Sequence, residues 1–152
     1  MSITDDKSKA ITHLLNGTMM SVKNSIPIES NFGKPELSGK SLQLHFGVLI
    51  GITGDVRGKL ILSGEMQVFS SIGEAMFGMP IQEEMVISLS GELGNIIAGG
   101  LSTNIGQSGL KTDITAPTVI EGSTNLFGYE KVIRLPLEFH TVGALDLFLI
   151  ID

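Results

Sequence analysis

SLQLHFGVLIGITGDVRGKLILS, residues 41–63, changes the apolar spacing of the chain from a helical period to a period of two. From Leu42 to Ile52 every second residue is apolar, which predicts a strand with one buried face. The turn residues Thr53-Gly54-Asp55 come next, and Val56–Ser63 is predicted to be a second strand. The two strands together predict a β-hairpin.

Helical spacing predominates on both sides of the hairpin, and further strand-like segments follow near the C-terminus. Pro136 within one of these segments predicts an edge position or a bulge, because proline lacks the N–H that a ladder needs. The order of elements predicts an α+β fold with helices packed on a largely antiparallel sheet, and the whole of 1–152 as one domain. The predicted helices are 4–24, 65–77 and 83–105; the predicted strands are 110–115, 130–140 and 142–151, with an irregular stretch and one short strand in 28–40.

Composition excludes several classes of protein. Hydrophobic residues make up 42% of the chain and charged residues 17%, which argues against disorder. The net charge of −6 argues against a nucleic-acid partner. The longest apolar runs are of strand length and the N-terminus has no signal-peptide pattern, so we expect no membrane association and a cytoplasmic location. The chain has no cysteine, and His13, His45 and His140 are scattered, so we expect no metal site.

The helix at 83–105 has an unusual exposed face. At 100° per residue, Ser88, Glu92, Asn95, Gly99 and Ser102 fall on one narrow stripe. The apolar residues fall roughly opposite and should pack on the sheet. They are Val86, Leu89, Leu93, Ile96, Ile97 and Leu101.

This face is interpreted as also containing the glycines Gly91, Gly94, Gly99 and Gly100. Each glycine costs the helix roughly 1 kcal/mol relative to alanine, which suggests close approach by something else. That neighbour is either a second helix, with Glu92 and Asn95 merely solvated, or a separate protein.

Glu92 and Asn95 are one turn apart, with Cβ atoms about 5–6 Å from each other, so they can act on one target. A carboxylate can pair with a lysine, and a carboxamide can both donate to and accept from a water. The pair indicates docking and water positioning, not covalent catalysis.

The spacing of Ser88, Glu92, Asn95 and Pro117 resembles the motif of the CheC, CheX and FliY phosphatases. That motif is Asp or Ser, three residues, Glu, two residues, Asn, twenty-one residues, and Pro. The flanking segments Glu92–Gly99, Pro117–Gly122 and Thr53–Gly58 also resemble CheX. CheC-type chains usually carry the motif twice, whereas this chain carries it once, which favours the CheX type.

The resemblance implies a CheC/CheX-like fold and a phosphatase that acts on a phosphorylated CheY-like response regulator. Glu92 would pair with the regulator's active-site lysine, and Asn95 would orient the attacking water. Ser88 and Pro117 would support the helix and the adjoining loop, and Gly91, Gly99 and Ser102 would form the docking face. The enzyme would need no cofactor of its own, because the regulator supplies Mg²⁺. The resemblance also implies a homodimer joined through edge strands.

Two other classes of function remain open from the sequence. One is a non-catalytic module, related to flagellar switch proteins, that binds a phosphorylated regulator without turnover. The other is a dimeric structural domain whose glycine-rich helix packs against its partner subunit. Burial of Glu92 and Asn95 would favour the second of these.

Overall fold

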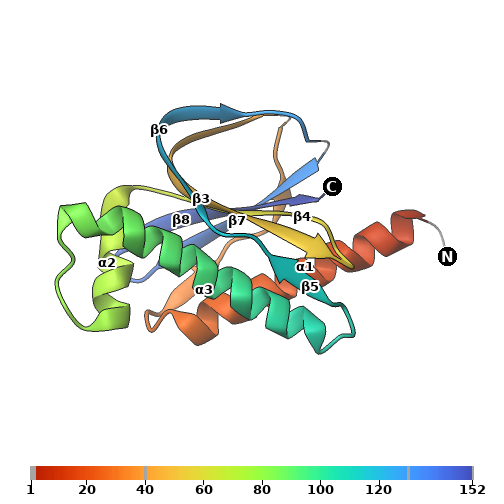
Figure 1. Ribbon diagram of the computed structural model, residues 1–152, viewed down its shortest axis with the longest axis horizontal. Helices are drawn as coiled ribbons and strands as arrows, with labels where there is room; N and C mark the ends of the chain where they lie inside the picture. The colour runs from red at the N-terminus through yellow and green to blue at the C-terminus, as the bar shows by residue number, and fades with distance from the viewer. Residues whose placement is uncertain (1–2, 40, 130, 152) are drawn as a thin grey trace.

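The fold, described by a computed structural model for residues 3–39, 41–129 and 131–151, combines helices with one curled antiparallel sheet. Helices α1 and α3 run along one side of the sheet, α2 lies at one end, and a β3–β6 ribbon curves over the other side (Figure 1). This confirms the predicted α+β class. The helical elements are α1 (Ile3–Ser25), α2 (Met66–Phe77), the 3₁₀ turn η1 (Glu83–Met85) and α3 (Val86–Gly106). The strands are β1 (Ser30–Phe32), β2 (Glu36–Leu37), β3 (Leu42–Gly54), β4 (Gly58–Ser63), β5 (Thr112–Ile114), β6 (Thr118–Leu126), β7 (Lys131–Phe139) and β8 (Gly143–Ile151).

The predicted hairpin is the β3–β4 pair, whose register runs from Gly47 opposite Ser63 to Ile52 opposite Gly58. The strand order is β1-β7-β8-β4-β3-β5, with β2 also paired to β7 and β6 also paired to β3. All of these pairs are antiparallel. The long strand β3 therefore joins the central sheet to the β5 and β6 segments.

The sheet is buried on both sides because each side covers a separate apolar cluster. The larger cluster lies between the helices and one face of the sheet, and includes Phe46, Val48, Leu60 and Leu135. The smaller cluster lies between the other face and the curved ribbon, and contains Leu42, Leu44, Ile61, Val132, Phe148 and Ile150. On β4, β7 and β8 the members of the two clusters alternate, as side chains on opposite faces of a strand must.

The prediction that all even-numbered apolar residues of β3 share one face was wrong at its beginning. Leu42 and Leu44 belong to the smaller cluster, whereas Phe46 and Val48 belong to the larger one. The register between β3 and β6 shifts between Leu44 and Phe46, where the ribbon bends away from the sheet. Bulges of this kind bend strands and change which residues face a core.

Pro136 lies at a bulge, one of the two kinds of position predicted for it. Phe32 is opposite Leu137 and Glu36 is opposite Arg134, so residues 33–35 face only residues 135 and 136. β7 lies between β8 on one side and the short strands β1 and β2 on the other, and Pro136 falls where β1 ends and β2 has not begun. There the Pro136 carbonyl accepts a hydrogen bond from Gly33 N–H at 2.8 Å. The interruption between β1 and β2 accommodates a residue that has no N–H to donate.

Candidate functional site

Helix α3 is held firmly from the side opposite its motif residues. Val86, Leu93, Ile97 and Leu101 are buried, as the sequence predicts, and Leu89 and Ile96 are half-buried. Two side-chain bonds join α3 to α1: Ser21 Oγ donates to the Ile97 carbonyl at 2.8 Å, and Asn104 Nδ2 donates to the Gly17 carbonyl at 3.0 Å. The helix is thus a rigid platform for whatever its outer face carries.

Ser88, Glu92 and Asn95 are all exposed on that outer face. Within the described part of the chain, neither Glu92 nor Asn95 has a side-chain hydrogen bond or ion pair. A carboxylate and a carboxamide one helical turn apart are therefore free to contact another molecule. The exposure shows that the pair does not belong to the core of this chain.

Pro117 approaches α3 beside the motif residues. A Cβ atom built on Gly91 would lie 3.7 Å from Pro117 Cγ and 3.5 Å from Val119 Cγ2. The loop before β6 therefore contacts α3 at the residue that precedes Glu92. Of the four motif residues, Pro117 alone reaches the helix from a different segment.

The glycines of α3 do not share the exposed face, and that interpretation of the sequence was wrong for three of them. Gly91 is buried against Pro117 and Val119. Gly94 is buried against β3, where an added Cβ would lie 2.7 Å from Val48. A Cβ on Gly100 would lie 2.2 Å from Ser21 Oγ on α1. These three glycines let the rest of the chain approach α3, because a helix without Cβ atoms offers a closer contact.

Gly99 and Ser102 differ within the proposed docking face. A Cβ on Gly99 would have no atom within 4 Å, so this position is open. Ser102 is half-buried, and its hydroxyl donates to the Thr112 carbonyl at 3.0 Å and lies 2.7 Å from Thr112 Oγ1. Ser102 thus ties β5 to α3 inside the chain, a role that the spacing on a helical stripe could not reveal.

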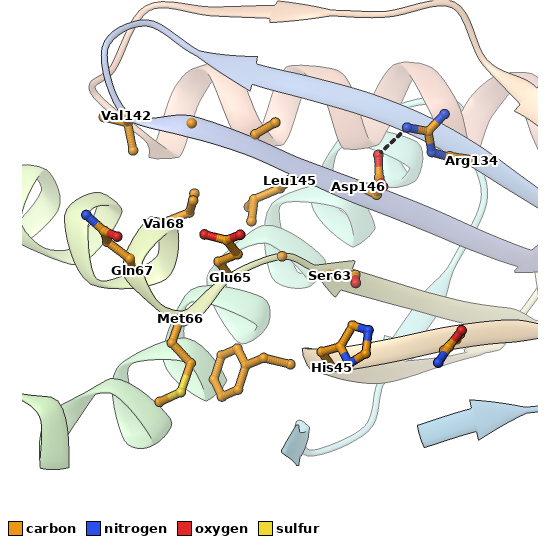
Figure 2. A pocket seen from close by; sticks show the side chains of 15 residues that line it. His45, Ser63, Glu65, Met66, Gln67, Val68, Arg134, Val142, Leu145 and Asp146 are labelled. Carbon is orange, nitrogen blue, oxygen red and sulfur yellow. Dashed lines mark ion pairs between the residues drawn. The ribbon is translucent and has the colours of Figure 1, made fainter. Parts of the chain in front are cut away.

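A hollow lined by residues of several strands and of α2 lies away from the motif. It has a volume of about 790 Å³ and opens where β4 passes into α2, with Glu65 and His45 among its lining residues (Figure 2). An ion pair of 3.0 Å between Arg134 and Asp146 crosses its edge, and Arg134 also pairs with Glu36. Hydrogen bonds to Asp146 and to Glu36 raise the pKa of the Arg134 guanidinium above its ordinary value. Because Arg134 is already neutralised and no motif residue lines the hollow, the motif chemistry does not use it.

Two further features concern metal binding and the apolar character of α3. In the described ranges, no three His, Asp or Glu side chains gather where they could hold a metal ion. The segment Glu83–Gly106 is long and apolar enough on average to cross a membrane by length and composition alone, although polar residues interrupt its apolar runs. Core helices of globular domains have the same properties, and α3 packs against α1, α2 and β3.

Comparison with known proteins agrees with the resemblance in the motif. The family model for the chemotaxis phosphatase CheX matches residues 46–133, more than half of the chain. A curated relative, the CheY-P phosphatase CheX of Thermotoga maritima, is 29% identical over 147 residues, covering 93% of this chain and 95% of the relative.

Solved structures show the same fold. The chemotaxis protein CheX from Desulfovibrio desulfuricans has a TM-score of 0.77 at 19% identity, covering 93% of this chain and 97% of that one. CheX in a CheX–CheY–BeF₃–Mg²⁺ complex from Borrelia burgdorferi has a TM-score of 0.74 at 22% identity, with the same coverage of 93% and 97%. The fold, the four-residue spacing and the family model thus agree.

Proposed function

The chain belongs to the chemotaxis phosphatase CheX family, and we propose that it hydrolyses the phosphoaspartate of a CheY-like response regulator through Glu92 and Asn95. The observation that carries this proposal is the position of these two side chains. They are exposed, one turn apart and without a partner in the described chain, on a helix fixed from behind. A projecting helix face suits insertion into a pocket on another protein, and the relative in the Borrelia burgdorferi structure is in complex with CheY.

Glu92 and Asn95 have different roles in the proposed reaction. The Glu92 carboxylate pairs with the regulator's active-site lysine and seats α3 over the phosphoaspartate. The Asn95 carboxamide accepts a hydrogen bond from a water and holds it in line with the phosphorus. Water then attacks phosphorus, the bond from phosphorus to the aspartate oxygen breaks, and inorganic phosphate and a free carboxylate result. Positioning and electrostatics supply most of the catalysis in phosphoryl transfer.

The remaining parts of the site have supporting roles. The regulator provides the Mg²⁺ that neutralises charge on the phosphoryl oxygens, and this chain brings no cofactor of its own. Ser88 extends the exposed row of the motif, and Pro117 supports α3 at Gly91. Gly99 leaves room for the partner's backbone, whereas Gly91 and Ser102 act from inside the chain. We also propose that the protein acts in the cytoplasm, and as a homodimer joined through edge strands.

The proposal is tested by measuring phosphate release from a phosphorylated CheY-like regulator with and without the protein. Asn95→Ala should lower kcat by about 100-fold or more, because the attacking water loses its position. Glu92→Ala should weaken binding of the regulator by about tenfold or more, since one partner of a charge pair is lost.

Exposed residues of the same type serve as controls for both substitutions. Asn24→Ala on α1 and Glu84→Ala in η1 should leave the rate unchanged. Equal phosphate release with and without the protein would rule out the enzyme for that regulator. Binding without turnover would instead support the non-catalytic module. Normal binding by an inactive Glu92→Ala variant would show that the two roles are wrongly divided.

A further inference from the structure

The chain between β5 and β6 contains one residue more than the strand opposite it. Both strands pair with the same edge of β3: Ile52 is opposite Ile114 in β5, and Leu49 is opposite Thr118 in β6. Between these pairs, residues 50 and 51 of β3 face residues 115, 116 and 117. Two residues opposite three define a β-bulge, which interrupts pairing and redirects the strand.

Thr115 holds this bulge against β3 through two hydrogen bonds to Gly51, one made by its backbone and one by its side chain. Its N–H donates to the Gly51 carbonyl at 2.9 Å, and its Oγ1 accepts a hydrogen bond from Gly51 N–H at 2.8 Å. The side chain of Thr115 thus replaces a main-chain acceptor that the bulge has displaced. The absence of a side chain on Gly51 makes room, because a Cβ there would lie only 3.0 Å from Thr115 Cγ2 and 3.1 Å from Thr115 Oγ1.

The bulge brings Pro117 to the motif helix. Pro117 has no N–H to offer the ladder, so it leaves β3 without sacrificing a hydrogen-bond donor. Its ring lies beside Gly91, with Cγ 3.7 Å from the position that a Cβ would occupy. Gly91 directly precedes Glu92 and lies one turn before Asn95. The hydrogen bonds between Thr115 and Gly51 therefore determine the position of Pro117, which packs against α3.

We infer that Thr115 is a positioning residue for Glu92 and Asn95, acting through Pro117 and Gly91, an inference that rests on the proposed phosphatase function. Thr115 does not contact the reacting atoms in this scheme. It fixes the bulge, the bulge fixes Pro117, and Pro117 limits movement of α3 at the turn that carries the motif. Small displacements of a positioned group lower the rate of the chemical step more than they lower binding.

The test compares two substitutions of Thr115 in steady-state phosphate release from the phosphorylated regulator. Thr115→Val keeps the shape but removes the acceptor for Gly51 N–H, and should lower kcat by about fivefold with KM changed less than about twofold. Thr115→Ser keeps the hydroxyl and should retain the kcat of the unsubstituted protein. The control is Thr53→Val, an exposed threonine on β3 two residues from Gly51, which should have no effect.

A second variant and a structural measurement make the result independent of folding. Gly51→Ala displaces the Thr115 side chain from the opposite direction, so it should lower kcat in the same way. Nuclear Overhauser contacts between Pro117 and Gly91 should weaken in Thr115→Val and Gly51→Ala but not in Thr115→Ser. Folded Thr115→Val and Gly51→Ala variants with the original kcat and contacts would overturn the inference while the phosphatase function stands. Absence of activity in the unsubstituted protein would instead overturn the function.

Discussion

Glu92 and Asn95 show how much of an active site one exposed pair of side chains can hold. Their polar groups are hydrated on the free protein, and only their own rotamers need ordering when a partner arrives, because α3 is already fixed by α1 and the sheet. Their spacing to Ser88 and Pro117 could be read from the sequence, since it depends only on residue numbers and helical period. The contact of Pro117 with Gly91 could not, because it depends on the bulge at residues 115–117, which is fixed by pairing with β3.

Ser90 lies on the same helix as Glu92 and Asn95, but it is buried where they are exposed. Its side chain is fully buried and, within the described part of the chain, its hydroxyl has no hydrogen-bond partner. We predict that Ser90→Ala raises the free energy of unfolding by about 1 kcal/mol, because an unpaired buried hydroxyl is unfavourable. Urea unfolding monitored by circular dichroism measures the change.

Ser21 is a matched control for this prediction. It is as deeply buried as Ser90, but its hydroxyl donates to the Ile97 carbonyl on α3. Ser21→Ala should therefore lower stability by about 1 kcal/mol. A loss of stability in Ser90→Ala similar to that in Ser21→Ala would mean that Ser90 makes a contact that contributes to folding.

At the scale of elements, the glycines of α3 serve the packing of the chain more than the approach of a partner. Gly94 and Gly100 let β3 and α1 come close to α3. Gly17 does the same from the side of α1, because a Cβ there would lie 2.8 Å from Leu101 on α3. The sequence indicated that something approaches this helix. It could not indicate which neighbour, because helical phase alone does not say on which sides a helix is covered.

A set of three alanine substitutions on α3 tests this account. Gly94→Ala and Gly100→Ala should each lower the free energy of unfolding by about 1–3 kcal/mol, because the added methyl group meets Val48 or Ser21 at short distance. Gly99→Ala, in open space, should raise it by up to about 1 kcal/mol through helix propensity. Thermal and urea unfolding give these values, and a stabilising Gly94→Ala would contradict the packing described for β3 and α3.

The strands differ in how clearly the sequence reveals them. β3, β4, β7 and β8 were predicted because buried strands show apolar alternation or dense apolar runs. β6 was missed. Its sequence TVIEGSTNL is mostly exposed, contains Gly122 at a positive φ of 97°, and pairs with β3 through a register shift. Strands of this kind are held by their neighbour's hydrogen bonds, so their own apolar pattern is weak.

At the scale of the whole molecule, the proposed catalytic face and the hollow lie on different elements. Glu92 and Asn95 lie on the outer side of α3, whereas the hollow opens at the start of α2 and is lined by residues of α2, of strands β3, β4 and β8, and by the ion-paired Arg134. The two lateral edges of the sheet also differ. β1 and β2 have three and two residues, while β6 has nine and its outer edge has no partner strand among the described residues.

The β6 edge is the better candidate for the proposed homodimer. β6 contains neither lysine nor proline, the residues that commonly block pairing at an edge, so a second copy could continue the sheet there. We predict that light scattering coupled to size exclusion gives twice the monomer mass, and that combining Ser123→Lys with Asn125→Lys shifts the protein to monomer. Like charges brought together across a two-fold pair of strands are destabilising.

The same charge placed on α2, with Gln67→Lys and Ala75→Lys, should leave the dimer intact. A monomer at every concentration would end the dimer proposal, and a dimer that survives the β6 substitutions would place the interface on another surface.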